Sequence, residues 1–138
     1  MRLLAVAMFA AATPAVAQIA PLSFDSGKAL PIAAGQWSYF STGTGSVASY
    51  GAAITLRCDR ATRTMTVTRP GAAPAALTIA TSSLTKTLPL GGRLLANDAL
   101  LDAMAFSRGR FLVSGGTGPV LAIPAWPEAA RSIEDCRN

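Results

Sequence analysis

The chain has 138 residues, of which 51% are hydrophobic, and it carries 12 basic residues, 7 acidic residues and no histidine. The missing histidine excludes Ser-His-Asp and Cys-His catalytic sites and leaves no imidazole to act as a general base. The net charge of +5 comes from basic residues spread along the chain. Because nucleic-acid-binding proteins usually concentrate such residues in one stripe, often between aromatic residues, we expect no nucleic-acid partner.

The first 17 residues have the features of a cleavable signal peptide. Arg2 supplies a positive charge, residues 3–12 are apolar, and Ala15-Val16-Ala17 is a typical cleavage sequence. The apolar stretch is much shorter than the ~20 residues of a membrane-spanning helix, so no membrane span is expected. Cleavage would leave Gln18 first, lower the net charge to +4 and lower the hydrophobic fraction to about 46%, an ordinary value for a globular domain. We therefore expect a periplasmic or secreted protein.

The remaining chain is long enough for one domain. Residues 18–35 contain Pro21, Pro31 and an Asp25-Ser26-Gly27 turn signal, which indicate an irregular lead-in segment before a single β-rich domain over residues 36–138. Trp37 and Tyr39 alternate within residues 36–41, as in a first strand, and residues 43–46 predict a flexible turn.

The clearest periodicity lies in residues 53–68. Ile54, Leu56 and Cys58 alternate with polar or small residues, and Met65 and Val67 alternate with threonines after a four-residue turn. This pattern predicts a β-hairpin with one face in water and with Cys58 on the inward face.

The later segments predict four more strands and two helices. The strands are expected at residues 76–81, 84–88, 110–114 and 119–123. A short helix of about three turns is expected over residues 97–107, with Asn97 or Asp98 as N-cap and Gly109 just after its end, and a last helix begins at Pro127. The predicted fold class is α+β, mainly β: a small antiparallel sheet or β-sandwich of about 6–7 strands, one short internal helix and a C-terminal helix.

Two cysteines remain after the predicted cleavage site, and export favours pairing them as a disulfide. The alternative is two free buried thiols. A bridge between Cys58 and Cys136 would close a loop of 78 residues and tether the C-terminal helix to the first hairpin, with a stabilisation of about 4 kcal/mol. Two thiols without histidine make a poor metal site, so no metal is expected.

One pattern matches an enzyme motif. Ser83-Leu84-Thr85-Lys86 has the S-x-x-K spacing of penicillin-recognising enzymes, but it lies in a strand-like segment that would point the two side chains apart. Each carboxylate already has a structural explanation, such as a turn or helix-cap position, and the glycine groups match no phosphate-binding motif. The sequence therefore predicts no catalytic residue and no cofactor.

Four arginines near the first hairpin form the remaining candidate surface: Arg57, Arg60, Arg63 and Arg69. As a functional patch they would bind an anionic partner such as an acidic lipid headgroup, a cell-wall polymer or an acidic protein. The alternative is that they are solvated charges that protect strand edges from pairing with other chains.

The order of features resembles a family of small periplasmic domains that includes the type VI secretion-associated VasI-like proteins. A cysteine ends a strand at Leu56-Arg57-Cys58, and a matching cysteine closes the C-terminal helix at Ile133-Glu134-Asp135-Cys136. Residues 100–113 resemble the short helix that leads into a strand in this family, and residues 119–124 with Trp126 resemble its last strand and the entry to the closing helix. The resemblance covers residues 37–136 and implies a non-enzymatic, β-rich envelope protein. A role in secretion is not carried over from the family, because no residue of this sequence marks contact with secretion machinery.

The first functional hypothesis is therefore a non-enzymatic periplasmic binding or accessory protein, whose partner is an envelope protein or an anionic envelope polymer. A second hypothesis is an inhibitor of an envelope hydrolase such as lysozyme, since small disulfide-closed β domains also inhibit such enzymes. The positive net charge argues against it, because it would repel a basic lysozyme. A third is an enzyme of unknown type. The sequence leaves the oligomeric state open.

Overall fold

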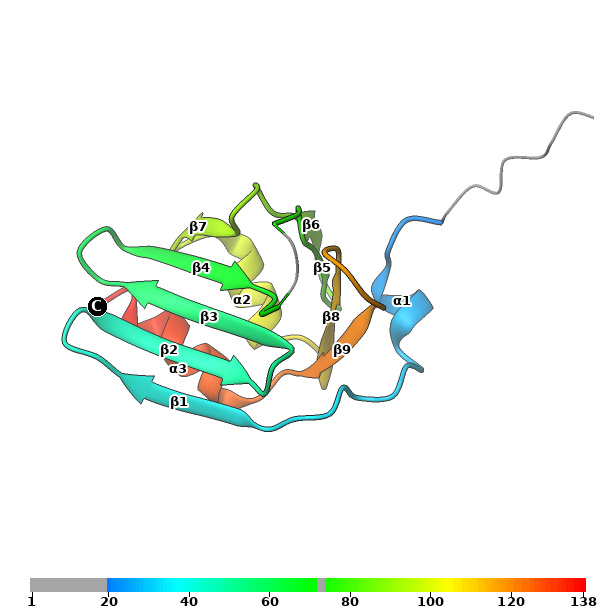
Figure 1. Ribbon diagram of the computed structural model, residues 1–138, viewed down its shortest axis with the longest axis horizontal. Helices are drawn as coiled ribbons and strands as arrows, with labels where there is room; N and C mark the ends of the chain where they lie inside the picture. Colours follow the sequence, from blue (N-terminus) through cyan, green and yellow to red (C-terminus); the bar gives the residue numbers. More distant parts are fainter. Residues whose placement is uncertain (1–19, 72–73) are drawn as a thin grey trace, which may run out of the picture.

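The computed structural model describes residues 20–71 and 74–138, so the predicted signal peptide over residues 1–17 lies outside the described part (Figure 1). The large sheet has the order β1-β2-β3-β4-β7, with β1 Trp37–Ser41, β2 Gly45–Tyr50, β3 Ile54–Asp59, β4 Thr64–Thr68 and β7 Arg93–Leu95. The small sheet has the order β6-β5-β8-β9, with β5 Thr78–Ala80, β6 Thr85–Thr87, β8 Arg110–Ser114 and β9 Leu121–Pro124. The helices are α1 Phe24–Gly27, α2 Ala99–Ala105 and α3 Pro127–Asp135.

The mainly β fold with antiparallel sheets and a tethered C-terminal helix is confirmed, but the described residues form nine strands rather than six or seven. The two additional strands are β2 and β7. Strand β2 begins at Gly45, inside the segment predicted as a flexible turn. A Cβ at Gly45 would lie 1.9 Å from the Cys58 carbonyl oxygen, so this glycine permits close approach of two strands.

The predicted hairpin is confirmed as β3 and β4, with Cys58 directly opposite Met65. Ile54, Leu56 and Cys58 are buried on the inward face, as the alternation indicated. The predicted disulfide is also confirmed: Cys58 is bonded to Cys136, and the two Cα atoms are 5.5 Å apart. The end of α3 is therefore fixed to the central strand of the large sheet.

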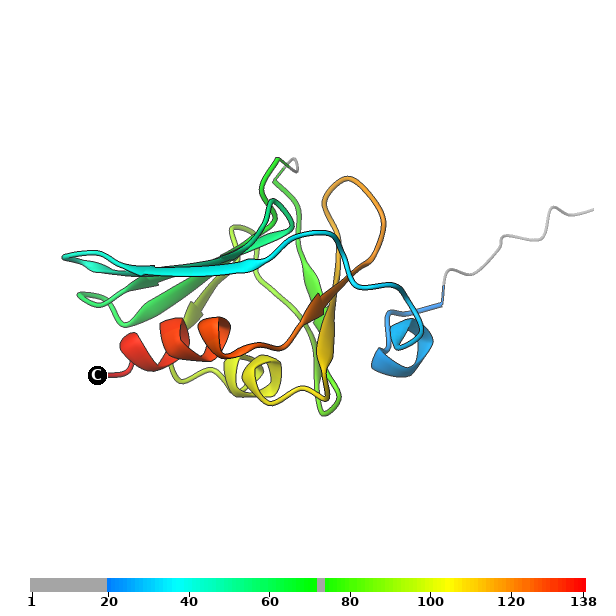
Figure 2. The same ribbon diagram turned by 90° about the horizontal axis from the view of Figure 1, so that it is seen from below.

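Helices α2 and α3 lie against the inward face of the large sheet, and the small sheet stands at a steep angle beside them (Figure 2). Helix α2 is shorter than predicted. Asp98, one of the two predicted caps, fixes its start, and the helix ends at Ala105 because Phe106 already leaves the helical conformation. Helix α3 begins at Pro127 as predicted. One hydrophobic core joins the large sheet, the two helices and one face of the small sheet.

The lead-in segment packs against the far face of the small sheet. Leu22 and Leu30 contact a small cluster that contains Leu112 and two alanines. A Cβ at Gly27 in α1 would lie 2.2 Å from the Leu112 side chain, so α1 approaches the sheet closely. Among the described helices, none is long and apolar enough to cross a membrane.

Candidate binding surface

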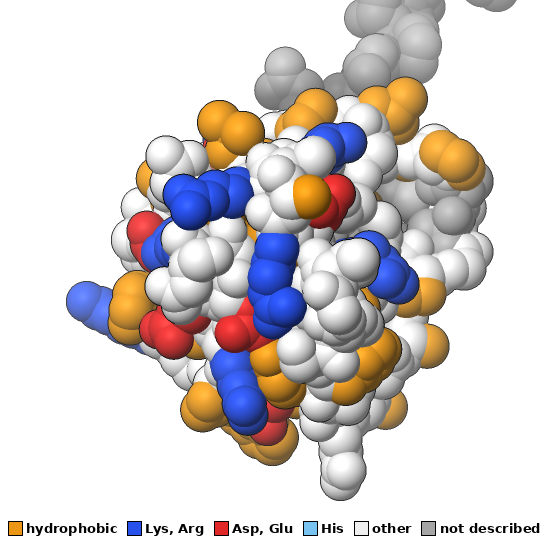
Figure 3. Space-filling model, turned by 90° about the vertical axis from the view of Figure 1, so that its left-hand side faces the viewer, with side chains coloured by type: hydrophobic (Ala, Val, Ile, Leu, Met, Phe, Trp, Pro, Cys, Tyr) orange, Lys and Arg blue, Asp and Glu red, His pale blue; other side chains and the backbone are white. Residues whose placement is uncertain are grey.

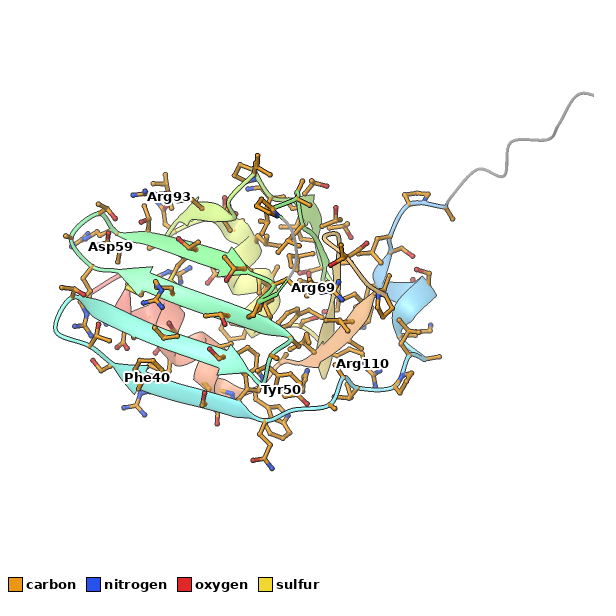
Figure 4. All side chains as sticks on the ribbon, viewed as in Figure 1. Phe40, Tyr50, Asp59, Arg69, Arg93 and Arg110 are labelled. Atoms are coloured by element: carbon orange, nitrogen blue, oxygen red, sulfur yellow. A yellow bond between two sulfur atoms is a disulfide. The ribbon has the colours of Figure 1, made fainter. Side chains whose placement is uncertain are left out.

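The four arginines singled out from the sequence lie at separate places on the β3–β4 hairpin. Arg57 is exposed in the middle of β3, and Arg60 and Arg63 belong to the turn that follows it. Arg69 lies beyond the other end of β4, away from Asp59 and the turn (Figure 4). Because Arg63 and Arg69 flank an extended strand, their Cα atoms are about 20 Å apart. The four side chains do not form one continuous patch.

Two of these arginines hold loops in place. Arg60 donates from Nη1 to the Thr42 carbonyl oxygen at 3.3 Å and from Nη2 to Ser41 Oγ at 3.2 Å. Arg69 donates from Nη1 to the Gly115 carbonyl oxygen at 3.0 Å and thereby joins the two sheets. Both side chains are half-buried. Their contacts favour a structural role, although one different from the protection of strand edges.

A broader surface lies around Arg57. We define the open face as the side chains of the large sheet that point away from α2 and α3, and no described element covers it (Figures 1 and 2). The strand register assigns its members: Ser38, Phe40, Val47, Ser49, Thr55, Arg57, Asp59, Thr64, Thr66, Thr68, Arg93 and Leu95.

The centre of the open face is one row that crosses all five strands. Phe40, Val47, Arg57, Thr66 and Arg93 lie opposite one another on successive strands. Val47 is only 4% exposed although it points outward, while its neighbour Phe40 is 53% exposed. The row therefore presents an aromatic ring at one edge of the sheet, one guanidinium group on the central strand and a second guanidinium group at the opposite edge. Since neighbouring strands are about 4.8 Å apart, Arg57 and Arg93 are separated by roughly 10 Å at their Cα atoms.

Hydroxyl groups surround this row. Ser38, Ser49, Thr55 and Thr68 form a second row beside it, and Ser49 Oγ lies 3.1 Å from Thr55 Oγ1. Together with Thr66, these side chains supply many donors and acceptors close to the two arginines. Within the described residues, Arg57 and Arg93 make no side-chain hydrogen bond or ion pair, so both guanidinium groups are available to a partner.

Asp59 is the one acidic side chain of the open face. It accepts hydrogen bonds from the backbone N–H groups of Ala61 and Thr62, at 3.0 and 3.3 Å. Hydrogen bonds from the Thr62 hydroxyl and these backbone groups, with a weaker contribution from the charge of Arg93, hold the pKa of Asp59 below its ordinary value. Its carboxylate is therefore ionised at neutral pH and already engaged. The two arginines leave the open face with a net positive charge.

Figure 3 views the molecule from the end that carries the β1–β2 and β3–β4 turns and the C-terminus. Basic and acidic side chains alternate on this end. Arg137, for example, is paired with Asp102 at 2.8 Å. This end is thus less suited to an anionic partner than the open face.

The S-x-x-K pattern has a structural explanation. Ser83 lies in the turn between β5 and β6, whereas Lys86 lies in β6 and donates from Nζ to Asp98 Oδ2 at 2.6 Å. Asp98 also caps α2 by accepting from the Leu100 N–H. The lysine therefore pairs with a helix cap rather than with the serine hydroxyl.

The carboxylates show a similar pattern. Asp25 pairs with Lys28, Asp102 pairs with Arg137, and Asp135 accepts a hydrogen bond from the Tyr39 hydroxyl. In the part of the chain that the structure describes, no three residues among Cys, Asp and Glu come together as a candidate metal site.

Comparisons of the chain with protein-family models, with curated proteins and with solved structures find no match. The resemblance to VasI-like proteins therefore stays a prediction.

Proposed function

We propose that the protein is a non-enzymatic binding protein of the bacterial periplasm that recognises an anionic envelope polymer with its open face. The observation that supports this most is the central row, in which Phe40 and the unpaired guanidinium groups of Arg57 and Arg93 are presented on one uncovered sheet. The periplasmic location rests on the predicted signal peptide. The VasI-like resemblance points to the same compartment.

The chemistry of the open face fits a polymer of sugars that carry carboxylate or phosphate groups. A guanidinium group can donate two parallel hydrogen bonds to either anion. The rows of serine and threonine supply the donors and acceptors that sugar hydroxyls need, and Phe40 offers an exposed apolar ring. An uncovered sheet of five strands can contact several units of an extended polymer at once.

A non-catalytic role is supported by the contacts of the groups that could otherwise do chemistry. Lys86 and Asp98 pair with each other, and Asp102 pairs with Arg137. The alternative of a hydrolase inhibitor is less favoured, because Arg57 and Arg93 would repel a basic lysozyme from this face.

The test is co-sedimentation of the protein with purified, insoluble peptidoglycan at increasing salt. We expect binding at low ionic strength that weakens as salt rises, because surface charges are screened. The double variant R57Q/R93Q should lose most of this binding, with the dissociation constant rising at least about tenfold, as the loss of two charge-assisted contacts predicts.

The matched control is the double variant K28Q/R108Q, which removes the same charge from exposed positions outside the open face. It should bind nearly as the unmodified protein does. Equal losses of binding in the two double variants would mean that the interaction is non-specific charge attraction. An absence of binding at low salt would reject the proposal.

A further inference from the structure

The free edge of β1 is the second unexplained surface of the molecule. In the β1–β2 pair, the Gly51 N–H donates to the Gln36 carbonyl oxygen, and the Thr42 N–H donates to the Gly45 carbonyl oxygen. Since hydrogen-bonded pairs alternate in an antiparallel ladder, the backbone groups of Trp37, Tyr39 and Ser41 point away from β2. Within the described residues these groups have no hydrogen-bond partner.

The other sheet edges are shorter or partly occupied. Strands β6 and β7 have three residues each. The edge of β9 is paired at Ala122, whose carbonyl oxygen accepts from the Ala33 N–H at 2.9 Å. Strand β1 has five residues and contains no charged residue and no proline. It therefore lacks the features by which proteins usually protect an exposed edge.

We propose that β1 pairs antiparallel with β1 of a second copy of this chain, around a twofold axis at Tyr39, so that two large sheets join into one. In this register Tyr39 lies opposite Tyr39 of the second copy, and Ser38 lies opposite Phe40. The two Phe40 rings come within about 7–8 Å along the diagonal, within reach of each other. The exposed ring at the edge of the open face would thus gain an apolar neighbour.

The charges beneath β1 favour a second copy over an unrelated peptide. Arg131 in α3 lies over the Tyr39 ring, 4.4 Å from its centroid, and the Tyr39 hydroxyl donates to Asp135 in the same helix. Tyr39 therefore lies between these two charges along α3. A twofold axis through Tyr39 reverses their order in the second copy, so Arg131 of one chain comes opposite Glu134 and Asp135 of the other.

The distances allow this pairing of charges. Helix α3 packs across β1, β2 and β3, so its axis lies about one and a half strand spacings from the twofold axis. The two helices are then about 14 Å apart, a gap that an arginine and a glutamate side chain can bridge. Each chain has an open hollow of about 530 Å³ beside α3, and in the dimer the two hollows would form part of the space between the helices. The lining of each hollow includes Tyr39, Glu128, Arg131 and Glu134.

The test measures both the mass and the hydrogen exchange of the protein, purified in the form that the cell produces. Sedimentation equilibrium should show a mass that rises toward twice the protomer mass with concentration. The amides of Trp37, Tyr39 and Ser41 should become protected as the dimer forms, whereas those of Ser38 and Phe40 are protected in both states because they pair with β2.

Two variants distinguish the free edge from other surfaces. S38K adds a charge at the edge, and S41P removes one outward N–H. Because S41P also removes the hydroxyl that accepts from Arg60, it is compared with S41A, which loses the same hydroxyl and keeps the N–H. S38K and S41P should each raise the dimer dissociation constant roughly tenfold or more, whereas S41A should leave it nearly unchanged. The matched control is T68K, which adds the same charge at an exposed position on β4. A protein that stays monomeric, or a dimer in which the three amides stay unprotected, would overturn the proposal.

Discussion

The disulfide between Cys58 and Cys136 joins the central strand of the large sheet to the end of the C-terminal helix. Both residues are buried in the main hydrophobic core. Helix α3 covers the inward face of β1, β2 and β3, so this bond fixes the element that supports the open face from behind.

Removal of the disulfide should lower stability strongly. In the chain-entropy account, a bridge that closes a loop of this length restricts the unfolded chain, and its loss costs up to about 4 kcal/mol. The variant C58A/C136A should therefore unfold at a much lower urea concentration than the oxidised protein. Reduction of the unmodified protein should reproduce most of the shift. An unchanged midpoint would show that packing alone holds α3 on the sheet.

A second link between the same elements is a buried hydrogen bond. Ser46 Oγ in β2 lies 3.0 Å from Ser132 Oγ in α3, and the two residues are 1% and 0% exposed. Either single change, S46A or S132A, should destabilise by about 1–3 kcal/mol, because it leaves a buried hydroxyl without a partner. The double variant should cost less than the sum of the two. A double-mutant cycle in urea measures this coupling, and strict additivity would mean that the hydroxyls act independently.

The pair of Asp98 and Lys86 should make stability depend on acid pH. Burial alone would raise the pKa of Asp98, but the Lys86 hydrogen bond, the Leu100 N–H and the Lys86 charge together hold it below its ordinary value of 3.8. A carboxyl with a lowered pKa stabilises the fold above its unfolded pKa, and this contribution is lost as the pH falls through the folded value. The loss thus begins near pH 4 and continues below it.

The variant D98A should test both roles of this side chain. Loss of the helix cap should cost about 1 kcal/mol at neutral pH, and unfolding should become less sensitive to pH below 4. The control is D25A, which removes a carboxylate that is 85% exposed and whose ion pair contributes little. An acid unfolding curve with the same slope in D98A and the unmodified protein would contradict this assignment.

The elements with strong alternation could be predicted from the sequence. Ile54, Leu56 and Cys58 mark β3, and Pro127 marks the start of α3. The sequence pattern does not predict strand β2, because small residues such as Ser46 and Ala48 fill its inward positions, where α3 and its neighbours approach closely. Such residues carry little periodic signal, and two glycines before them suggested a turn instead.

The open face could be predicted only in part. The sequence predicts Arg57 as a candidate because it belongs to the first hairpin, but it does not predict Arg93, since β7 has three residues and no periodic pattern. Arg93 joins the central row through the pairing of β7 with β4, which is set by contacts between distant parts of the chain. Likewise, nothing in the sequence around Arg60 and Arg69 indicated that backbone carbonyl groups of other loops accept their hydrogen bonds.

Two nearby glycines should respond very differently to the same substitution. A Cβ at Gly45 would meet the Cys58 carbonyl oxygen at 1.9 Å, whereas at Gly43 it would meet nothing within 4 Å. The obstacle at Gly45 is backbone, so β2 and β3 must move apart, and G45A should destabilise by about 2–3 kcal/mol. G43A should stay within about 0.5 kcal/mol of the unmodified protein in urea unfolding. Similar stabilities for the two variants would mean that β2 and β3 separate easily at this end. The rest of the sheet would then have to set the register that aligns Val47 with Arg57.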